Sequence, residues 1–173
     1  MITFISPDAP DIYPEELRAD IDALNVIIYA DFNLAVNLAA LVTNQKDYEY
    51  YYDRIFARLD WLEERLSKQR YLMGDTITDS DIRIFPTLAR FDLVFYQKYL
   101  VNKKRLVDYP NLWNYAKDLY SNPAFGGTTD FDSMRKRFYY VDHTPFEDLP
   151  RLVPKGPDDS IWLEPNDRAE KIW

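Results

Sequence analysis

The sequence predicts an all-α protein, built as a helical bundle that is followed by an extended C-terminal tail. Apolar residues recur at helical spacing over several long segments, and no segment shows the apolar–polar alternation of a strand. Only 4 of the 173 residues are glycine, which disfavours a turn-rich all-β fold. We expect a lead-in over residues 1–13, one helical domain over 14–143, and a proline-rich tail over 144–173 that packs on the domain.

The first helix is expected to begin at Pro14 and to run to about Val42. Prolines before it favour an extended lead-in, whereas Pro14 followed by two glutamates is typical of a helix start. The apolar residues behind this start fall on one helical face, and neither glycine nor proline interrupts the segment. That face consists of Leu17, Ile21, Leu24 and Ile28.

Two further helices follow from spacing and capping signals. The second has apolar positions in steps of four and three, which favours a bundle helix over a short coiled coil: Tyr48, Tyr52, Ile55, Leu59, Leu62 and Leu66. The third opens with Thr78 as the N-cap and Asp81 reaching back to the cap N–H, with Ile77 and Ile82 as a hydrophobic staple. Its buried stripe is expected to be Ile82, Phe85, Leu88 and Ala89, and Pro86 is expected to kink it.

The remaining helices are shorter, and about five or six are expected in all. A fourth starts at Tyr109-Pro110 and stops at Asn122-Pro123, and Gly126-Gly127 predicts a flexible turn. Asp130 is expected to cap a fifth helix that carries Arg135, Lys136 and Arg137. We interpret these three basic residues as a solvated helix face in preference to an anion site.

Composition excludes several functions. A formal charge of −8 argues against nucleic acid as a partner. We expect no apolar stretch of membrane-span length, and no signal peptide is apparent, so the expected location is cytoplasmic, without a membrane. The absence of cysteine excludes disulfides and a cysteine nucleophile in this chain. No histidine stands beside Asp60, Glu63 or Glu64, so no metal is expected, and His143 is interpreted as a surface or loop residue.

Several segments, in order, resemble one family: Leu59–Leu66 before Tyr71-Leu72-Met73-Gly74, Thr78–Arg83, Arg90-Phe91-Asp92, Tyr109-Pro110-Asn111-Leu112-Trp113, Phe131-Asp132, and Val153-Pro154-Lys155-Gly156-Pro157. Over about residues 12–158 the chain resembles the C-terminal domain of the Xi-class glutathione transferases, the glutathionyl-hydroquinone reductases. The resemblance implies a helical bundle of the glutathione-transferase C-terminal type. Because the chain opens where the interdomain linker should lie, we expect a fragment of a two-domain protein, or a protein that has lost its first domain.

The resemblance also implies a function. The family carries a preceding thioredoxin-fold domain with the catalytic cysteine and the glutathione site, and it removes glutathione reductively from glutathionyl-hydroquinones. This chain would be the electrophile-binding and dimerisation domain of such a protein, forming a homodimer. It would hold no cofactor itself, whereas the parent would use glutathione or another small thiol. The alternative is a non-catalytic module for protein interactions.

The family's C-terminal domain supplies three site tyrosines, and local alignment carries them onto Asn37, Phe95 and Phe138, with Tyr139 adjacent. None of the three aligned positions is tyrosine here. Phenylalanine keeps the shape of tyrosine without its hydroxyl, so we expect an apolar substrate-binding pocket and no catalytic residue in this chain. The chain is therefore expected to be a divergent member. Arg90 and Asp92 are expected to form structural salt bridges, with each other or with other partners.

Overall fold

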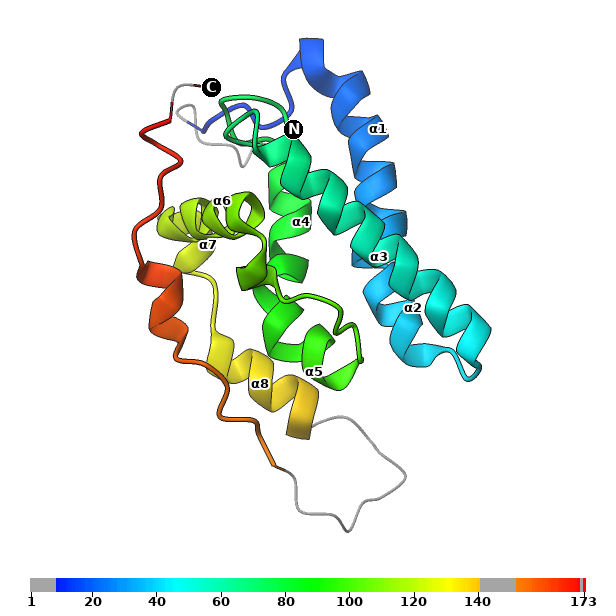
Figure 1. Cartoon of the computed structure of the whole chain (residues 1–173). Coiled ribbons are helices and arrows are strands. Elements are labelled where there is room, and N and C mark those ends of the chain that lie inside the picture. Colours follow the sequence, from blue (N-terminus) through cyan, green and yellow to red (C-terminus); the bar gives the residue numbers. More distant parts are fainter. Residues whose placement is uncertain (1–8, 141–151, 172) are drawn as a thin grey trace, which may run out of the picture.

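A computed structural model describes residues 9–140, 152–171 and 173, with the side chain of Tyr140 excepted. These residues form helices and turns with no strand, apart from an isolated antiparallel bridge between Tyr71 and Gly74. The long helices pack side by side around a common core, and the tail runs along one flank (Figure 1). The all-α expectation is therefore confirmed. His143 and the expected boundary between domain and tail lie outside the described residues.

The first helical run extends from Glu15 to Leu41, close to the predicted limits, but it is not uniform. It comprises the 3₁₀ turn η1 (Glu15–Leu17), α1 (Arg18–Ile28), the π-helical segment η2 (Tyr29–Asn33) and α2 (Ala35–Leu41). In η2 the N–H of Leu34 donates to the carbonyl of Tyr29 over 2.8 Å. Such a turn holds one extra residue and shifts every later side chain around the axis. The periodicity of the sequence did not predict it.

The same run corrects the expectation about membrane spans. Glu15–Leu41 is 27 residues long and apolar enough to cross a membrane by length and composition alone. Ile21, Ile28, Phe32 and Val36 of this run nevertheless lie fully in the core of the bundle. A core helix passes the same composition test as a membrane span, so the apolar character of this run is explained by packing on one side.

Helix α3 (Gln45–Leu66) lies antiparallel beside α2 (Figure 1). Asn44 caps it by accepting from the N–H of Asp47 over 2.9 Å. Its buried face is Ile55, Phe56, Leu59, Leu62 and Leu66. Asp31 of η2 receives hydrogen bonds from Arg54 and Arg58. Because the three charges are held between two helices, they fix the position of the π turn against α3.

The central run comprises α4 (Asp79–Arg90), a second π-helical segment η3 (Phe91–Phe95) and the single turn α5 (Tyr96–Lys98). Pro86 is accommodated inside α4. Asn33 of η2 donates to the carbonyl of Arg83 over 3.0 Å and accepts from the Thr87 hydroxyl over 2.8 Å. This amide clamps the first run to α4 on either side of the proline, where the helix lacks a backbone donor.

One prediction for α4 was wrong. Ile82, expected in the buried stripe, is 39% exposed, and Ile84 is buried instead. The predicted staple therefore has its inner member, Ile77, packed on the core, while Ile82 is left at the surface.

The second half of the bundle contains the 3₁₀ turn η4 (Leu106–Asp108), α6 (Pro110–Ser121), α7 (Pro123–Gly126) and α8 (Phe131–Tyr140). Asp130 accepts from the N–H of Ser133 over 2.9 Å, as a residue capping α8 should. The turn at Gly126 is packed, not flexible, because a Cβ there would lie 2.2 Å from the carbonyl oxygen of Tyr120. Glycine at this point allows α7 to fold back against α6.

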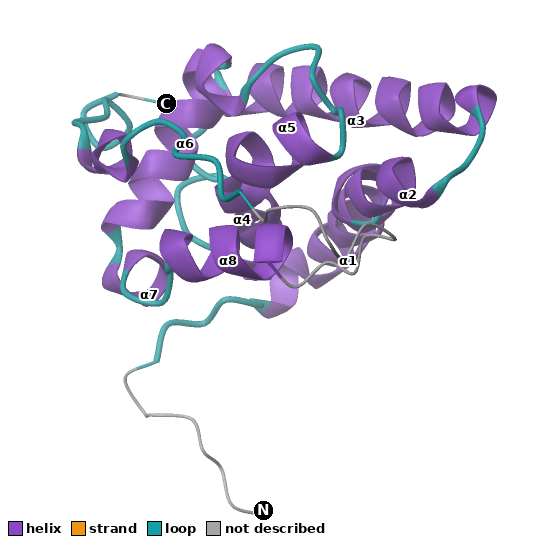
Figure 2. Cartoon of the chain, turned by 90° about the horizontal axis from the view of Figure 1, so that it is seen from below, coloured by secondary structure: helices purple, strands orange, loops and turns teal. Residues whose placement is uncertain are grey.

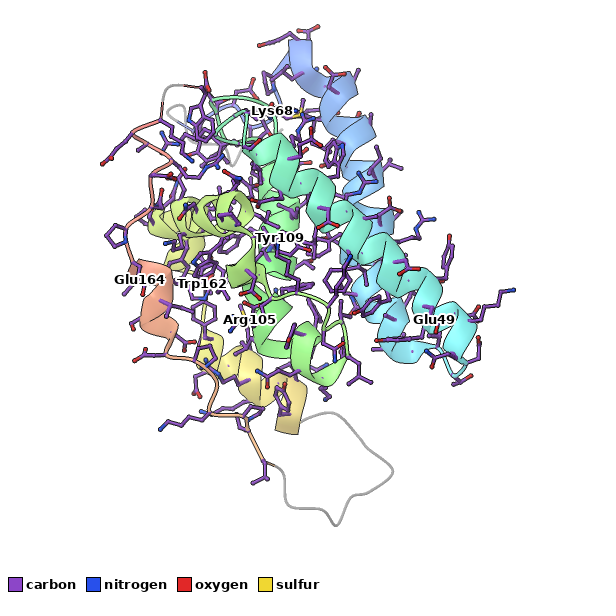
Figure 3. The ribbon with its side chains drawn as sticks, viewed as in Figure 1. Glu49, Lys68, Arg105, Tyr109, Trp162 and Glu164 are labelled. Atoms are coloured by element: carbon purple, nitrogen blue, oxygen red, sulfur yellow. The ribbon has the colours of Figure 1, made fainter. Side chains whose placement is uncertain are left out.

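The described tail packs on α6 and α8 and includes the 3₁₀ helix η5 (Asp159–Leu163). Figure 2 shows α7 and α8 on the same side of the molecule as α1, opposite α3, with α4 between the two sides. Trp162 points from η5 into the bundle, whereas Glu164 points away (Figure 3). Arg168 is fully buried and donates to the carbonyls of Leu66, Gln69 and Arg70. These carbonyls lie at and just beyond the C-terminal end of α3, where helix acceptors lack backbone partners.

Candidate functional site

The N-terminus of α4 is organised around one buried carboxylate, that of Asp81. It accepts from the N–H and the hydroxyl of Thr78 over 2.8 and 2.9 Å. It also accepts from the Leu72 N–H over 2.9 Å and from the Tyr115 hydroxyl over 2.7 Å. Burial raises the pKa of Asp81, and these hydrogen bonds oppose that rise. Because all four donors to the Asp81 carboxylate come from the protein itself, this carboxylate is suited to holding α4, the preceding turn and α6 together.

A pocket of about 280 Å³ opens along α4 from Ile82 to Arg90, between α4, α7 and α8. Its walls are mainly apolar and include Ile82, Phe85, Pro86, Phe125 and Met134. The exposure of Ile82, which the sequence did not predict, results from its place at this pocket. A small number of polar groups beside a largely apolar wall is the usual composition of a small-molecule site.

A second, more open hollow adjoins this pocket. The two share Arg90, Thr128 and Met134 as lining residues. The second hollow adds Arg137 and Phe138 of α8, together with Asp130 and Ser133. The pocket and the hollow together are called the α4–α8 cleft below.

Two of the predicted site residues meet at the end of this cleft. The rings of Phe95 and Phe138 are 6.3 Å apart and nearly perpendicular, and Tyr99 contacts both. Phe95 is only 3% exposed, whereas Phe138 is partly exposed and lines the hollow. Edge-to-face contacts of this kind stabilise the packing of α8 against η3. Phe138 can therefore touch a ligand directly, and Phe95 supports it from behind.

Tyr139 lies beside this cluster, but its hydroxyl is already used. It donates to the carbonyl of Leu93 over 3.2 Å, and burial raises the pKa of this tyrosine. Lys98 lies over its ring, with the ammonium nitrogen 5.4 Å from the centroid, and donates to the Phe138 carbonyl. The phenol thus anchors α8 to η3 and has no proton to offer to a ligand in this arrangement.

Asn37 is not brought to the cluster. It is exposed on α2, and its side-chain amide donates to the Asn33 carbonyl one turn earlier, over 2.9 Å. No described contact joins it to Phe95, Phe138 or Tyr139. The structure therefore assembles three of the four predicted substrate-binding residues and leaves the fourth on a separate helix.

The expected salt bridges of Arg90 and Asp92 were wrong. Asp92 accepts from the N–H groups of Leu106 and Val107 and so caps η4; burial raises its pKa. Arg90 donates to the Pro86 carbonyl over 2.6 Å, and burial lowers its pKa. No carboxylate among the described residues pairs with it. Side chains two positions apart point to different sides of a helix, which accounts for the separation.

The prediction of a solvated basic face on α8 holds for Lys136 and Arg137, which are exposed, and fails for Arg135. The Arg135 side chain is 11% exposed and pairs with Asp159 of the tail, with one N–O distance of 2.8 Å. Lys136 pairs with Asp132 one turn earlier. Arg137 remains exposed and faces the hollow. Spacing along α8 placed the three cations on a helix, but it did not show which of them meets the tail.

The residues available for a metal or a cofactor are few. Within the described residues no group of three or more histidine, aspartate or glutamate side chains could hold a metal ion. The chain has no thiol. What the α4–α8 cleft offers is an apolar wall, two guanidinium groups and several hydroxyls, which suits binding of an organic molecule.

Comparisons with known proteins identify the family. Residues 45–118 match the family model described as glutathione S-transferase, C-terminal domain. Glutathionyl-hydroquinone reductase PcpF of Sphingobium chlorophenolicum is 38% identical over 147 residues, covering 85% of this chain and 46% of the relative. The chain is a glutathione S-transferase C-terminal domain. This confirms the family suggested by its motifs.

Solved structures agree with this assignment. The Xi glutathione-S-transferase of Phanerochaete chrysosporium is 37% identical with a TM-score of 0.81, over 87% of this chain and 48% of that one. The glutathione-bound transferase homologue YqjG of Escherichia coli is 34% identical with a TM-score of 0.86, over 94% and 52%. This transferase domain thus spans about half the length of the relatives that it matches.

Proposed function

We propose that this domain is the electrophile-binding and dimerisation half of a two-domain glutathione-transferase-like protein, whose parent is a thiol-dependent enzyme of the glutathionyl-hydroquinone reductase type. The observation that carries the proposal is the α4–α8 cleft, an apolar pocket ending at Phe138 in a chain without cysteine. Such a chain can bind an aromatic electrophile but needs a thiol from elsewhere. The relative YqjG binds glutathione, which supports this thiol for the parent.

A second support is an exposed apolar strip where the first helical run meets α4, and its Ile82 also borders the α4–α8 cleft. Asn25 of α1 donates to Asp79 of α4 over 2.9 Å, which marks where the two helices meet. Tyr29 follows Asn25 by four residues and is 59% exposed. Ile82 follows Asp79 by three, so both side chains lie along the same seam. We assign this strip to the preceding thioredoxin-fold domain, because the matched relatives are about twice as long as this chain.

The decisive experiment is an assay of the parent protein on a glutathionyl-hydroquinone with glutathione supplied. We expect turnover that requires a cysteine in a thioredoxin-fold domain upstream. Because Asn37, Phe95 and Phe138 stand where the family has tyrosines, we expect the rate to fall well below that of PcpF. Acid–base groups each contribute on the order of 10²–10⁴-fold in a working site. A rate equal to that of PcpF would show that the domain is not divergent.

The alternative is a non-catalytic interaction module, and the absence of a hydroxyl at Phe95 and Phe138 favours it. A parent that lacks a thioredoxin-fold domain, or that binds partners without turnover, would establish this reading.

Homodimerisation is proposed for the domain itself. Exposed apolar side chains at Leu41, Tyr50 and Leu100 are available to a second copy. Light scattering of the 173-residue chain tests this, since a monomer at high concentration would contradict it.

A further inference from the structure

The α4–α8 cleft contains a positive charge that the fold does not neutralise. Arg90 is partly buried, its one hydrogen-bond partner among the described residues is the Pro86 carbonyl, and no described carboxylate pairs with it. Other partly or fully buried arginines of the bundle have more partners: Arg65 donates twice to the Leu72 carbonyl and lies over the Trp61 ring. Arg58 meets Asp31, Arg70 meets Asp118, and Arg168 meets four carbonyls. Burying a cation without a partner is costly, so this exception calls for a ligand.

A second guanidinium lies at the same place. Arg137 of α8 lines the hollow together with Arg90, and it has no ion pair or hydrogen bond to another described residue. The carboxylate at the rim, that of Asp130, is used by the N–H and the hydroxyl of Ser133, over 2.9 and 2.6 Å. Two arginines therefore converge on one opening from different helices.

The apolar part of the cleft adjoins these charges directly, since Arg90 lines both parts. Its volume of about 280 Å³ is roughly twice that of an apolar cavity of about 150 Å³ that admits benzene. One substituted aromatic ring thus fits against Met134 and the packed pair Phe85 and Phe125, whose ring centres are 5.1 Å apart. The planar fork of an arginine is matched in shape to a carboxylate at the ring's edge.

We propose that the α4–α8 cleft selects aromatic ligands that carry an anionic substituent, with Arg90 binding the anion and Arg137 assisting at the rim. This inference rests on the proposed function in one respect, which is that the aromatic ring of the ligand is taken to be a hydroquinone. The preferred ligands are then hydroquinones that bear a carboxylate or a similar acid, in preference to neutral ones.

The test uses the 173-residue chain and two probes that differ in charge but hardly in shape. These are 2,5-dihydroxybenzoate and 2,5-dihydroxybenzamide, titrated by calorimetry or by ligand-observed NMR. We expect the benzoate to bind at least about tenfold more tightly, because a hydrogen-bonded ion pair replaces a neutral contact. We expect Arg90→Gln to remove that preference while leaving the weaker binding of the benzamide unchanged.

A matched control comes from the same helix. Arg83 is an exposed arginine two turns before Arg90, it pairs with Asp79, and it does not line the cleft. Arg83→Gln removes one positive charge from the same helix and should leave the benzoate preference intact. Arg137→Gln should reduce the preference by a smaller factor than Arg90→Gln, and Arg90→Lys should restore part of it.

The outcomes separate this inference from the proposed function. Equal binding of the two probes, or a benzoate preference that survives Arg90→Gln, overturns the inference whatever the parent's activity. If the benzoate preference depends on Arg90 but the parent has no reductase activity, the inference is supported and only the proposed function is overturned. Circular dichroism of each variant shows that the bundle is intact, so a folding defect is not mistaken for lost binding.

Discussion

The two ends of helix α4 contain charged groups of opposite kinds. At its N-terminus, Asp81 is fully buried and accepts four hydrogen bonds from Leu72, Thr78 and Tyr115. At its C-terminal end, Arg90 is partly buried and has one carbonyl partner beside an open cleft. A charge that the fold satisfies completely serves the fold, because it has no capacity left for a ligand. A charge that the fold leaves unsatisfied marks where binding is to be expected.

The first way to break this comparison is Asp81→Ala. It removes the acceptor of four donors in the core, and each buried donor left without a partner costs about 1–3 kcal/mol. We expect a loss of about 3 kcal/mol or more in the free energy of unfolding, measured by urea denaturation followed by circular dichroism. If the protein does not fold, Asp81→Asn, which keeps one acceptor oxygen, should fold with a smaller loss.

An unfolding free energy of Asp81→Ala within about 1 kcal/mol of the wild type would contradict a structural role for the carboxylate. Asp47→Ala is a suitable comparison. It also changes an acid in the first turn of a helix, but it lies at the exposed start of α3.

Phe95 and Phe138 test which residues form the wall of the cleft and which lie behind it. Phe95→Tyr places a hydroxyl at a position that is 3% exposed, which costs about 1–3 kcal/mol if the group finds no partner. Phe138→Tyr adds the same group beside an open hollow and should change stability by less than about 0.5 kcal/mol. Thermal unfolding of both variants gives the comparison. Equal stability would place both rings on the surface of the site.

The sequence predicted part of this arrangement, and the reason lies in the range of each interaction. Thr78 and Asp81 are three residues apart at a helix start, so their pairing follows from local geometry alone. Tyr115, which completes the network, is 34 residues further along and carries no local signal. The cap was therefore predictable, whereas the satisfied carboxylate was not.

The site itself was predicted less completely, for two physical reasons. Each π segment, η2 before Asn37 and η3 ending at Phe95, adds a residue to a turn, so helical periodicity cannot show which way a later side chain points. Arg90 was recognised only as part of a triplet with Asp92. Its place in the cleft depends on α7 and α8, which reach it through the fold and not through neighbouring sequence.

Tyr115→Phe tests one hydrogen bond of the Asp81 network by itself. It deletes a hydroxyl that donates over 2.7 Å and keeps the ring in the core. A single hydrogen bond to a charged acceptor contributes about 1.5–3 kcal/mol, and the three remaining donors lessen the loss. We therefore expect about 1–2 kcal/mol by urea denaturation. The double variant with Asp81→Asn should lose less than the sum of the single losses, because both changes remove the same bond. Additive losses would mean that the two groups act separately.

The smallest effect is expected at the other end of α4. Arg90→Met keeps an unbranched stem against the apolar wall and removes a cation that has no anionic partner among the described residues. The variant loses the hydrogen bond to the Pro86 carbonyl, but it also no longer buries an unpaired cation, which is unfavourable. Because the two effects offset each other, the free energy of unfolding should change by less than about 0.5 kcal/mol. A large destabilisation would show that Arg90, like Asp81, serves the fold. Unchanged stability together with lost binding of 2,5-dihydroxybenzoate would separate the two charges completely, since one end of α4 would then be needed for folding and the other for recognition.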